Sequence, residues 1–297
     1  MFNFSFSSVS MCVVTSNIFL IMIYLILGKQ KLISEIGYKI IGYFLLFAIL
    51  RFCFPFELPV TTNIYFPEFI SMIIANFQCP CIPLFGAKIS VWNIVEVIWF
   101  GGIAIFLFRY LKRRHVFLRF LKENAQSTPE LRRYEKLAAQ ICTDLHKKQN
   151  FKIIGLSGAK SPMVCFWKKP CIIMPLSLNF TDSELTLMLE HEIQHIFHHD
   201  LLLKSGICLL NIIYWWNPFG HFLKKQCDLI LEMRADKNIV GADSQLTAAY
   251  LDCLLKTSKL LNSWSPKQET AIPFCSRNSS ELTTRFRALT DVKEKKA

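Results

Sequence analysis

The stretch Glu190–His195 contains residue types at a spacing that could activate a water molecule. His191 and His195 are four residues apart, so on a helix both imidazoles lie on one face and can bind one metal ion. Glu192 can then take a proton from a water on that ion. This H-E-x-x-H pattern predicts a zinc site in which Glu192 is the general base, because zinc is the metal expected of the pattern.

A buried helix must hold this pattern. Thr181 and Glu184 have the spacing of a capping box, which predicts a helix that begins there and runs to about Asp200. Apolar residues at helical spacing would supply its buried contacts: Leu185, Met188, Leu189, Ile193, Ile196 and Phe197.

A peptidase zinc needs a third protein ligand and leaves its fourth position to water. Glu232 is the best later ligand, on a helix expected to end near Gly241. Residues 201–223 look like a fourth membrane span, but a crossing there would put Glu232 on the wrong side. We therefore expect 201–223 to fold back as a buried or membrane-leaning helix that bends at Asn217–Pro218.

The composition is that of a membrane protein. Of 297 residues, 52% are hydrophobic, and 26 are Phe. The net charge of +12 comes from basic residues beside apolar runs, which favours cytoplasmic loops and anionic lipid over direct nucleic-acid binding. The 11 cysteines have no repeated spacing and are interpreted as apolar filler in a reducing environment.

Three apolar runs, at about 9–28, 40–58 and 90–110, are long enough to cross a bilayer, which takes ~20 residues. Basic residues follow the first and the third run, so the N-terminus is expected outside and everything after about 111 in the cytoplasm. The predicted division is 1–115 for the transmembrane helices and 116–297 for a cytoplasmic domain.

Two charged residues interrupt these runs. Arg51 and Glu96 would lie at nearly the same depth in antiparallel helices, so either they form an ion pair or Arg51 reaches the outer headgroups. The basic, amphipathic stretch 114–122 is expected along the inner membrane surface.

The cytoplasmic half has signals for helices and a small sheet. Ser127–Glu130 has the features of a helix start with Pro in the first turn, and the helix is expected to run to about Lys148. Phe151–Leu156 and Cys171–Met174 predict short strands. The expected fold class is a mostly α membrane protein with a cytoplasmic α+β domain.

Several motifs occur together in a recognisable order. The chain resembles the BlaR/MecR family of membrane-embedded zinc metallopeptidases, a gluzincin branch. The motifs are Ser161–Val164, Pro170–Pro175, the H-E-x-x-H residues, Asp200, Trp216–Pro218 and Glu232-x-x-x-Asp236.

This resemblance implies a role for each site residue. His191, His195 and Glu232 would be the zinc ligands, and Glu192 the general base that later protonates the leaving amine. Asp236 would orient His191 by accepting its other N–H.

The resemblance also implies a setting and a substrate. The protein would lie in a bacterial plasma membrane, with three N-terminal transmembrane helices and a cytoplasmic gluzincin-like metallopeptidase domain. Its substrate would be a cytoplasmic protein such as a transcriptional repressor, or the protease itself. The small strands could offer an edge to an extended substrate.

The chain departs from the family pattern in two places. Phe166 stands where the family usually has Gly after the Ser-Pro strand. Signalling members, which act in antibiotic-resistance regulation, continue into an extracellular penicillin-binding sensor, whereas this chain stops at Ala297. Either the chain is cut there or this member senses something else, so antibiotic sensing is not carried over.

Two other classes of protein stay open: a non-catalytic signal transducer braced by zinc, and a four-span transporter or channel. A homodimer also stays open. Five residues could supply an oxyanion donor near the metal, but a structural role is expected for each: His198, His199, Tyr214, His221 and Arg234.

Overall fold

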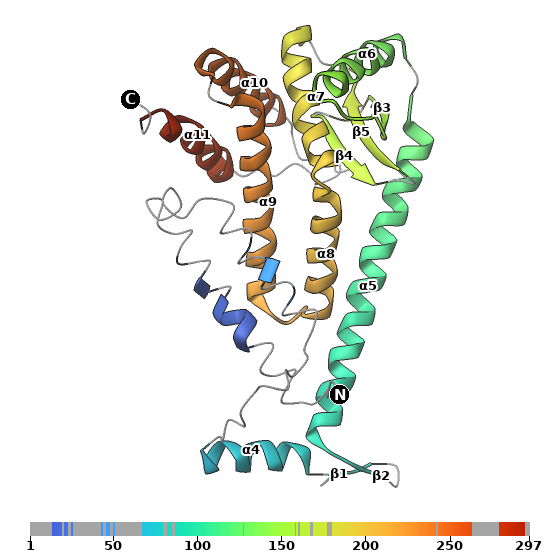
Figure 1. Cartoon of the computed structure of the whole chain (residues 1–297). Helices are drawn as coiled ribbons and strands as arrows, with labels where there is room; N and C mark the ends of the chain where they lie inside the picture. Colours follow the sequence, from blue (N-terminus) through green and yellow to red (C-terminus); the bar gives the residue numbers. More distant parts are fainter. Residues whose placement is uncertain are drawn as a thin grey trace. The chain divides into compact units, whose positions relative to one another are not determined.

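The structure is a computed structural model of the whole chain (Figure 1). It describes scattered residues between 14 and 50 and the ranges 67–79, 82–84, 87–126, 128–157, 159, 161–166, 169–176, 180–241, 243–262 and 279–294. The chain forms two compact units: residues 1–112 with 207–223, and residues 113–206 with 224–297.

The first unit contains a long apolar helix. After α4 (Glu68–Gln78) and the antiparallel pair β1 (Ile82–Leu84) and β2 (Ala87–Ile89), the first part of α5 (Val91–Asn124) belongs to this unit. The hydroxyl oxygen of Ser90 accepts from the backbone N–H of Asn93 at 3.2 Å, which caps the start of α5.

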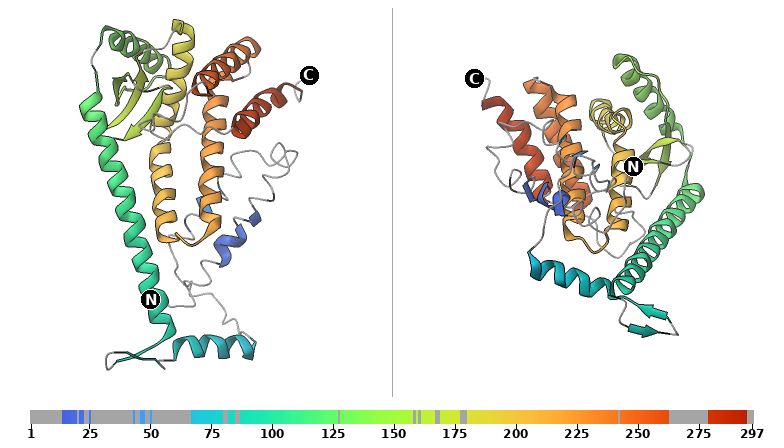
Figure 2. Two further views of the ribbon diagram at one scale, coloured as in Figure 1. Left: turned by 180° about the vertical axis from the view of Figure 1, so that it is seen from behind. Right: turned by 60° about the horizontal axis from the view of Figure 1, so that its bottom comes forward.

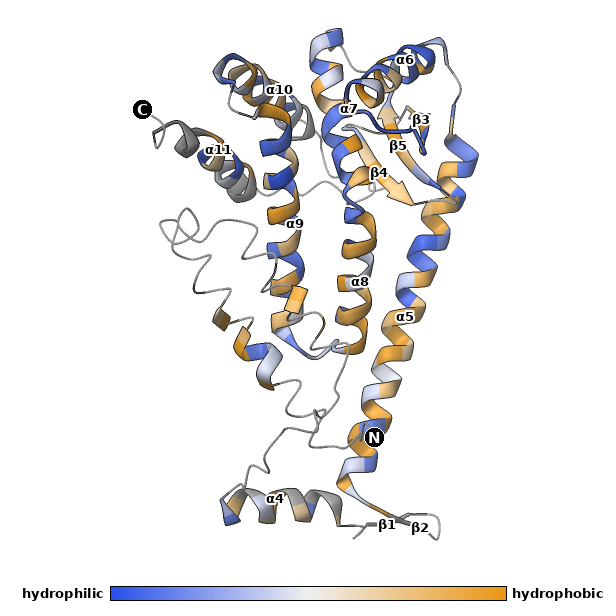
Figure 3. Ribbon diagram, viewed as in Figure 1, coloured by the Kyte–Doolittle hydropathy of each residue, from blue (hydrophilic) through white to orange (hydrophobic). Residues whose placement is uncertain are grey.

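Only α5, among the described residues, is by itself long and apolar enough to cross a membrane (Figure 3). It contains the run predicted at 90–110. The runs predicted at 9–28 and 40–58 fall mostly outside the described residues. So does Arg51, and with it the proposed pair with Glu96.

The expectation for residues 114–122 is wrong. The helix α5 continues without a break to Asn124. Leu121, fully buried, and Phe117 pack with Ile154 and Ile173 in one hydrophobic cluster of the second unit. The apolar side of this stretch therefore covers a protein surface instead of a membrane surface. An amphipathic pattern indicates an apolar partner but does not identify it.

A three-stranded sheet lies at the centre of this packing. Its order is β3-β5-β4, with β3 parallel and β4 antiparallel to β5. The strands are β3 (Lys152–Leu156), β4 (Met163–Phe166) and β5 (Pro170–Pro175). The two strands predicted from apolar runs are confirmed. Phe166 is the last residue of β4, where it pairs with Pro170.

Both faces of the sheet are covered by helices. Successive residues of a strand point to opposite faces, so Ile172 packs in a cluster with α6 and α7, whereas Ile173 packs with Leu121 of α5. The helix predicted to begin at 127–130 is α6 (Pro129–Asp144), which ends four residues earlier than expected. The sheet and α6 together support α7.

The helix α7 (Asp182–Phe197) carries the H-E-x-x-H residues. Its predicted capping box is present: Thr181 Oγ1 accepts from the Glu184 N–H at 3.3 Å, and the Thr181 N–H donates to Glu184 Oε2 at 2.8 Å. α7 ends slightly before the expected position, and α8 (Asp200–Ile213) follows after a 61° bend. Taken together, the bent pair α7 and α8 also has the length and composition of one broken span.

The chain reverses after α8, as predicted. A turn at 214–216 leads to α9 (Pro218–Val240), which begins with Pro218 at its first position. Lys204 Nζ on α8 lies 3.4 Å from Glu232 Oε1 on α9, so the two helices run side by side (Figure 2). The expected bend is thus a break between two helices. Because the chain reverses there, Glu232 of α9 lies beside the histidines of α7.

Two aromatic contacts hold this turn in the first unit. Trp99 Nε1 donates to the Ile213 carbonyl at 2.7 Å, and the Trp215 ring stacks on Phe106 with centroids 5.8 Å apart. Two further helices of the described residues are α10 (Ser244–Asn262) and α11 (Ser279–Glu294), both in the second unit.

Candidate metal centre

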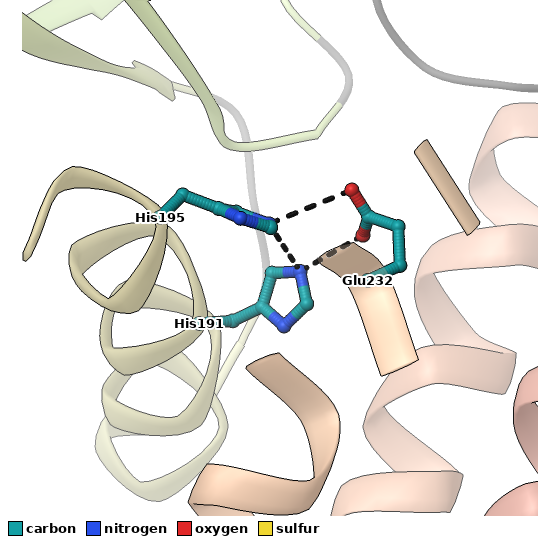
Figure 4. Close-up of side chains that lie close together, drawn as sticks. All are labelled: His191, His195 and Glu232. Atoms are coloured by element: carbon teal, nitrogen blue, oxygen red, sulfur yellow. Dashed lines mark hydrogen bonds and ion pairs between the residues drawn. The ribbon is translucent and has the colours of Figure 1, made fainter. Parts of the chain in front are cut away.

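Three side chains of the second unit converge on one point (Figure 4). His191 and His195 extend from α7 with their Nε2 atoms 3.2 Å apart. Glu232 extends from α9, with Oε2 at 3.1 Å from His191 Nε2 and Oε1 at 3.5 Å from His195 Nε2. Both histidines are buried, at 8% and 6% exposed. The two ligands expected from spacing and the third expected from the fold-back are thus brought together.

The separations fit a metal ion. An ion held tetrahedrally at ~2.0–2.2 Å from each donor needs donor atoms about 3.3–3.6 Å apart. The observed separations run from 3.1 to 3.5 Å when the nearer Glu232 oxygen is taken for each histidine, Oε2 for His191 and Oε1 for His195. Two histidines and one glutamate are also the donor set of a metallopeptidase site that keeps an open fourth position.

His195 is oriented by a buried carboxylate. Its Nδ1 lies 2.7 Å from Oδ2 of Asp200, which is 2% exposed. Arg234 donates to the other oxygen of Asp200. A carboxylate ion can only accept, so Nδ1 of His195 carries a proton and Nε2 is the nitrogen that faces the centre.

His191 is held by a longer network. Its Nδ1 lies 2.8 Å from the hydroxyl of Tyr250 and 3.4 Å from Oδ1 of Asp236. The Tyr250 hydroxyl donates to Asp236 Oδ1 at 2.6 Å. Arg285 of α11 donates to both oxygens of Asp236, from Nε at 2.7 Å and from Nη2 at 2.6 Å.

Asp236 is ionised in this network. It is fully buried, and burial alone would raise its pKa. The Arg285 guanidinium and His191 outweigh burial and lower the pKa of Asp236 to about 2.

The Glu232 carboxylate has two cations beside it. Arg285 Nη1 lies 3.3 Å from Oε2, and Lys204 Nζ lies 3.4 Å from Oε1. Burial acts to raise the pKa of Glu232, but His191, His195 and Arg285 hold it well below its usual range. Glu232 is therefore an anionic donor.

Glu192 follows His191 on α7 and is half-buried. Its charge interacts with that of Lys204, which also lies 4.0 Å from Asp228 Oδ1. The positive charge of Lys204 therefore interacts with both Glu192, the expected general base, and Glu232, the expected ligand.

The residues considered as oxyanion donors have other contacts. Arg234 bonds Asp200, and His198 Nδ1 lies 2.8 Å from the Gln194 carbonyl at the end of α7. His199 is exposed and has a φ of 57° between α7 and α8. His221 and Tyr214 belong to the first unit.

Sequence reasoning missed Lys204, Tyr250 and Arg285 as members of the site. Tyr250 lies 59 residues from His191 in sequence, and Arg285 lies 49 residues from Asp236. No local spacing signals such contacts, because α10 and α11 bring these side chains in by tertiary packing.

Known proteins are similar in sequence to the part of the chain that contains the candidate metal centre. The family model described as "BlaR1 peptidase M56" matches residues 82–289. The regulatory protein BlaR1 of Bacillus licheniformis is 31% identical over 103 residues, which are 34% of this chain and 17% of that protein. The methicillin resistance mecR1 protein of Staphylococcus aureus is 25% identical over 153 residues, 51% of this chain and 26% of that protein.

The matches cover only 17% and 26% of the length of these relatives. The family match, in contrast, covers most of the present chain and includes every residue of the candidate metal centre. The chain therefore belongs to the BlaR1 peptidase M56 family.

Proposed function

We propose that this protein is a membrane-bound zinc endopeptidase of a signal-transducing type, which cleaves a cytoplasmic protein, such as a repressor, or itself. The family supports peptidase activity, and one of the relatives bears the name "regulatory protein". The three predicted N-terminal spans, the outside N-terminus and the cytoplasmic site are part of this proposal. The apolar helix α5 supports a membrane location.

One observation carries the proposal. The hydrogen bonds at Nδ1 leave the Nε2 atoms of both histidines facing the centre, where they lie 3.2 Å apart with an anionic carboxylate oxygen 3.1 Å from one of them. Three donor atoms so close together require positive charge among them, either protons on the imidazoles or a metal ion that replaces those protons. A zinc ion suits two imidazoles and a carboxylate at these distances.

Bound by His191, His195 and Glu232, zinc would supply the Lewis acidity that lowers the pKa of a water toward ~7 and polarises a peptide carbonyl. Glu192 would take the proton of the attacking water and return it to the leaving amine. Asp200 would keep the proton on Nδ1 of His195, and Asp236 with its partners would do the same for His191.

The sheet suggests how a substrate would bind. β4 is an edge strand, whereas the free side of β3 is bridged by Gln126, which pairs with Gly155. An extended peptide would add to β4 through main-chain hydrogen bonds. β4 packs beside α7, so such a peptide would lie near the helix that carries Glu192.

The test uses the full chain purified in detergent with zinc, as wild type, Glu192→Gln and Glu232→Ala. Metal content is measured by elemental analysis. Cleavage of the chain itself and of an unfolded protein such as casein is measured by mass spectrometry. We expect about one zinc per wild-type chain, zinc with cleavage reduced at least ~100-fold in Glu192→Gln, and loss of zinc in Glu232→Ala.

Zinc without cleavage in the wild type, or equal cleavage in Glu192→Gln, would contradict catalysis and favour a transducer that zinc only braces. Zinc retained in Glu232→Ala would mean that the third ligand is another residue.

A further inference from the structure

We propose that Tyr250 is a positioning residue of the metal centre, which relays the orienting effect of Asp236 to His191 and fixes the nitrogen that faces the metal. This inference rests on the metal site of the proposed function but not on catalysis. It changes the expected role of Asp236, which would act through the Tyr250 hydroxyl instead of accepting directly from His191.

The distances favour the relay over direct contact. Nδ1 of His191 lies 2.8 Å from the Tyr250 hydroxyl, a normal hydrogen-bond length, but 3.4 Å from Asp236 Oδ1. The hydroxyl itself lies 2.6 Å from that carboxylate oxygen. Tyr250 therefore lies between the two residues and contacts both at short range.

The number of available protons fixes which group donates in each hydrogen bond of the relay. Asp236 is an anion that accepts two hydrogen bonds from Arg285, so it has no proton to donate. The single hydroxyl proton of Tyr250 must then go to Asp236, and the hydroxyl oxygen is left to accept. Only an N–H at Nδ1 of His191 can satisfy that oxygen, which makes Nε2 the nitrogen that is available to a metal ion.

Packing fixes the position of the hydroxyl. Tyr250 is 2% exposed and belongs to a hydrophobic cluster with Leu187 of α7, Ile239 and Val240 of α9, and Leu289 of α11. Four helices therefore meet around its ring. A buried ring held on several sides cannot swing its hydroxyl away from His191 without opening this cluster.

The test measures zinc affinity of the full chain by competition with a chromophoric chelator. Tyr250→Phe keeps the ring and removes the relay, so we expect zinc to bind about 10-fold or more weakly. Tyr134→Phe is the matched control: Tyr134 is also buried, in the core of the same unit, and its hydroxyl donates to the Pro175 carbonyl at 3.3 Å. We expect this control to bind zinc as the wild type does.

A double-mutant cycle separates the relay from a direct contact. If Asp236 acts through Tyr250, Asp236→Asn weakens zinc binding in the wild type but causes no further loss in Tyr250→Phe. The absorption spectrum of the cobalt-substituted protein should change in Tyr250→Phe and stay unchanged in Tyr134→Phe.

Wild-type affinity in Tyr250→Phe would overturn the relay, as would an Asp236→Asn effect of the same size in both backgrounds. A wild-type chain that binds no zinc would overturn the relay together with the proposed function. A chain that binds zinc through the relay but cleaves nothing would leave the relay standing and refute only catalysis.

Discussion

Asp200 Oδ2 lies 2.7 Å from Nδ1 of His195, although the two residues belong to different helices. Residues five apart on a continuous helix do not share a face. Here His199, with a φ of 57°, and the 61° bend between α7 and α8 turn Asp200 back toward the last turn of α7. The bend is therefore part of the metal centre.

Asp200→Asn should weaken zinc binding by about 10-fold to 100-fold, because an amide can turn its NH₂ toward His195 and no longer enforces the proton on Nδ1. Chelator competition measures the change. Asp182→Asn is the control, since Asp182 lies on the same helix as His195, and its side chain is 67% exposed. Equal affinities in the two variants would refute the orienting role of Asp200.

Arg285→Met should lower the free energy of unfolding by about 3–5 kcal/mol in the zinc-free protein, because it leaves Asp236 buried without its cation. Denaturant unfolding followed by fluorescence measures the loss. Arg132→Met removes the same charge from an exposed position of α6 in the same unit and should change stability by less than about 0.5 kcal/mol. A loss of the same size in both variants would mean that the removed charge, and not the contact with Asp236, is responsible.

The contribution of Asp236 to stability should depend on pH. Its pKa is about 2 in the folded protein, below the ~3.9 of an unfolded chain. The contribution is therefore present above pH ~4 and is lost as the pH falls toward ~2. The stability difference between wild type and Asp236→Asn, measured without zinc, should shrink by about 2–3 kcal/mol over that interval. A difference that grows on acidification would contradict the assignment.

Leu121→Ala should destabilise the second unit by about 2–5 kcal/mol, because it opens a cavity where α5 packs on the sheet. Val116→Ala, at a position 58% exposed on the same helix, should have little effect. Thermal unfolding of the detergent-solubilised chain measures both. Equal, small effects would restore the membrane-surface interpretation of residues 114–122.

The site residues that lie close together in sequence could be predicted from the sequence alone. His191, His195 and the capping box at Thr181 are close in sequence, so helix geometry alone relates them. Glu232 followed from a chemical requirement, since a site with two ligands is incomplete. Tyr250 could not be predicted, because its place depends on how α10 packs against α7 and α9.

The same distinction holds for the fold. The strands β3 and β5 could be predicted, because each is a short apolar run bounded by Gly or Pro, and the resemblance indicated β4. The length of α5 was not visible, because Lys112–Arg114 looked like the end of a membrane span. Basic residues mark the level of a headgroup layer, but a helix can continue beyond it when a protein surface covers its next turns.

The cations beside Glu232 bear on the order in which the protein matures. Lys204 and Arg285 already compensate the charge of this half-buried carboxylate, at 3.4 and 3.3 Å. On the proposed function, newly made chains would therefore complete the second unit before they acquire an ion, and metal loading would be a late step of assembly. An arriving ion would have to displace part of this compensation, so that cellular zinc supply would set the fraction of finished molecules that are competent.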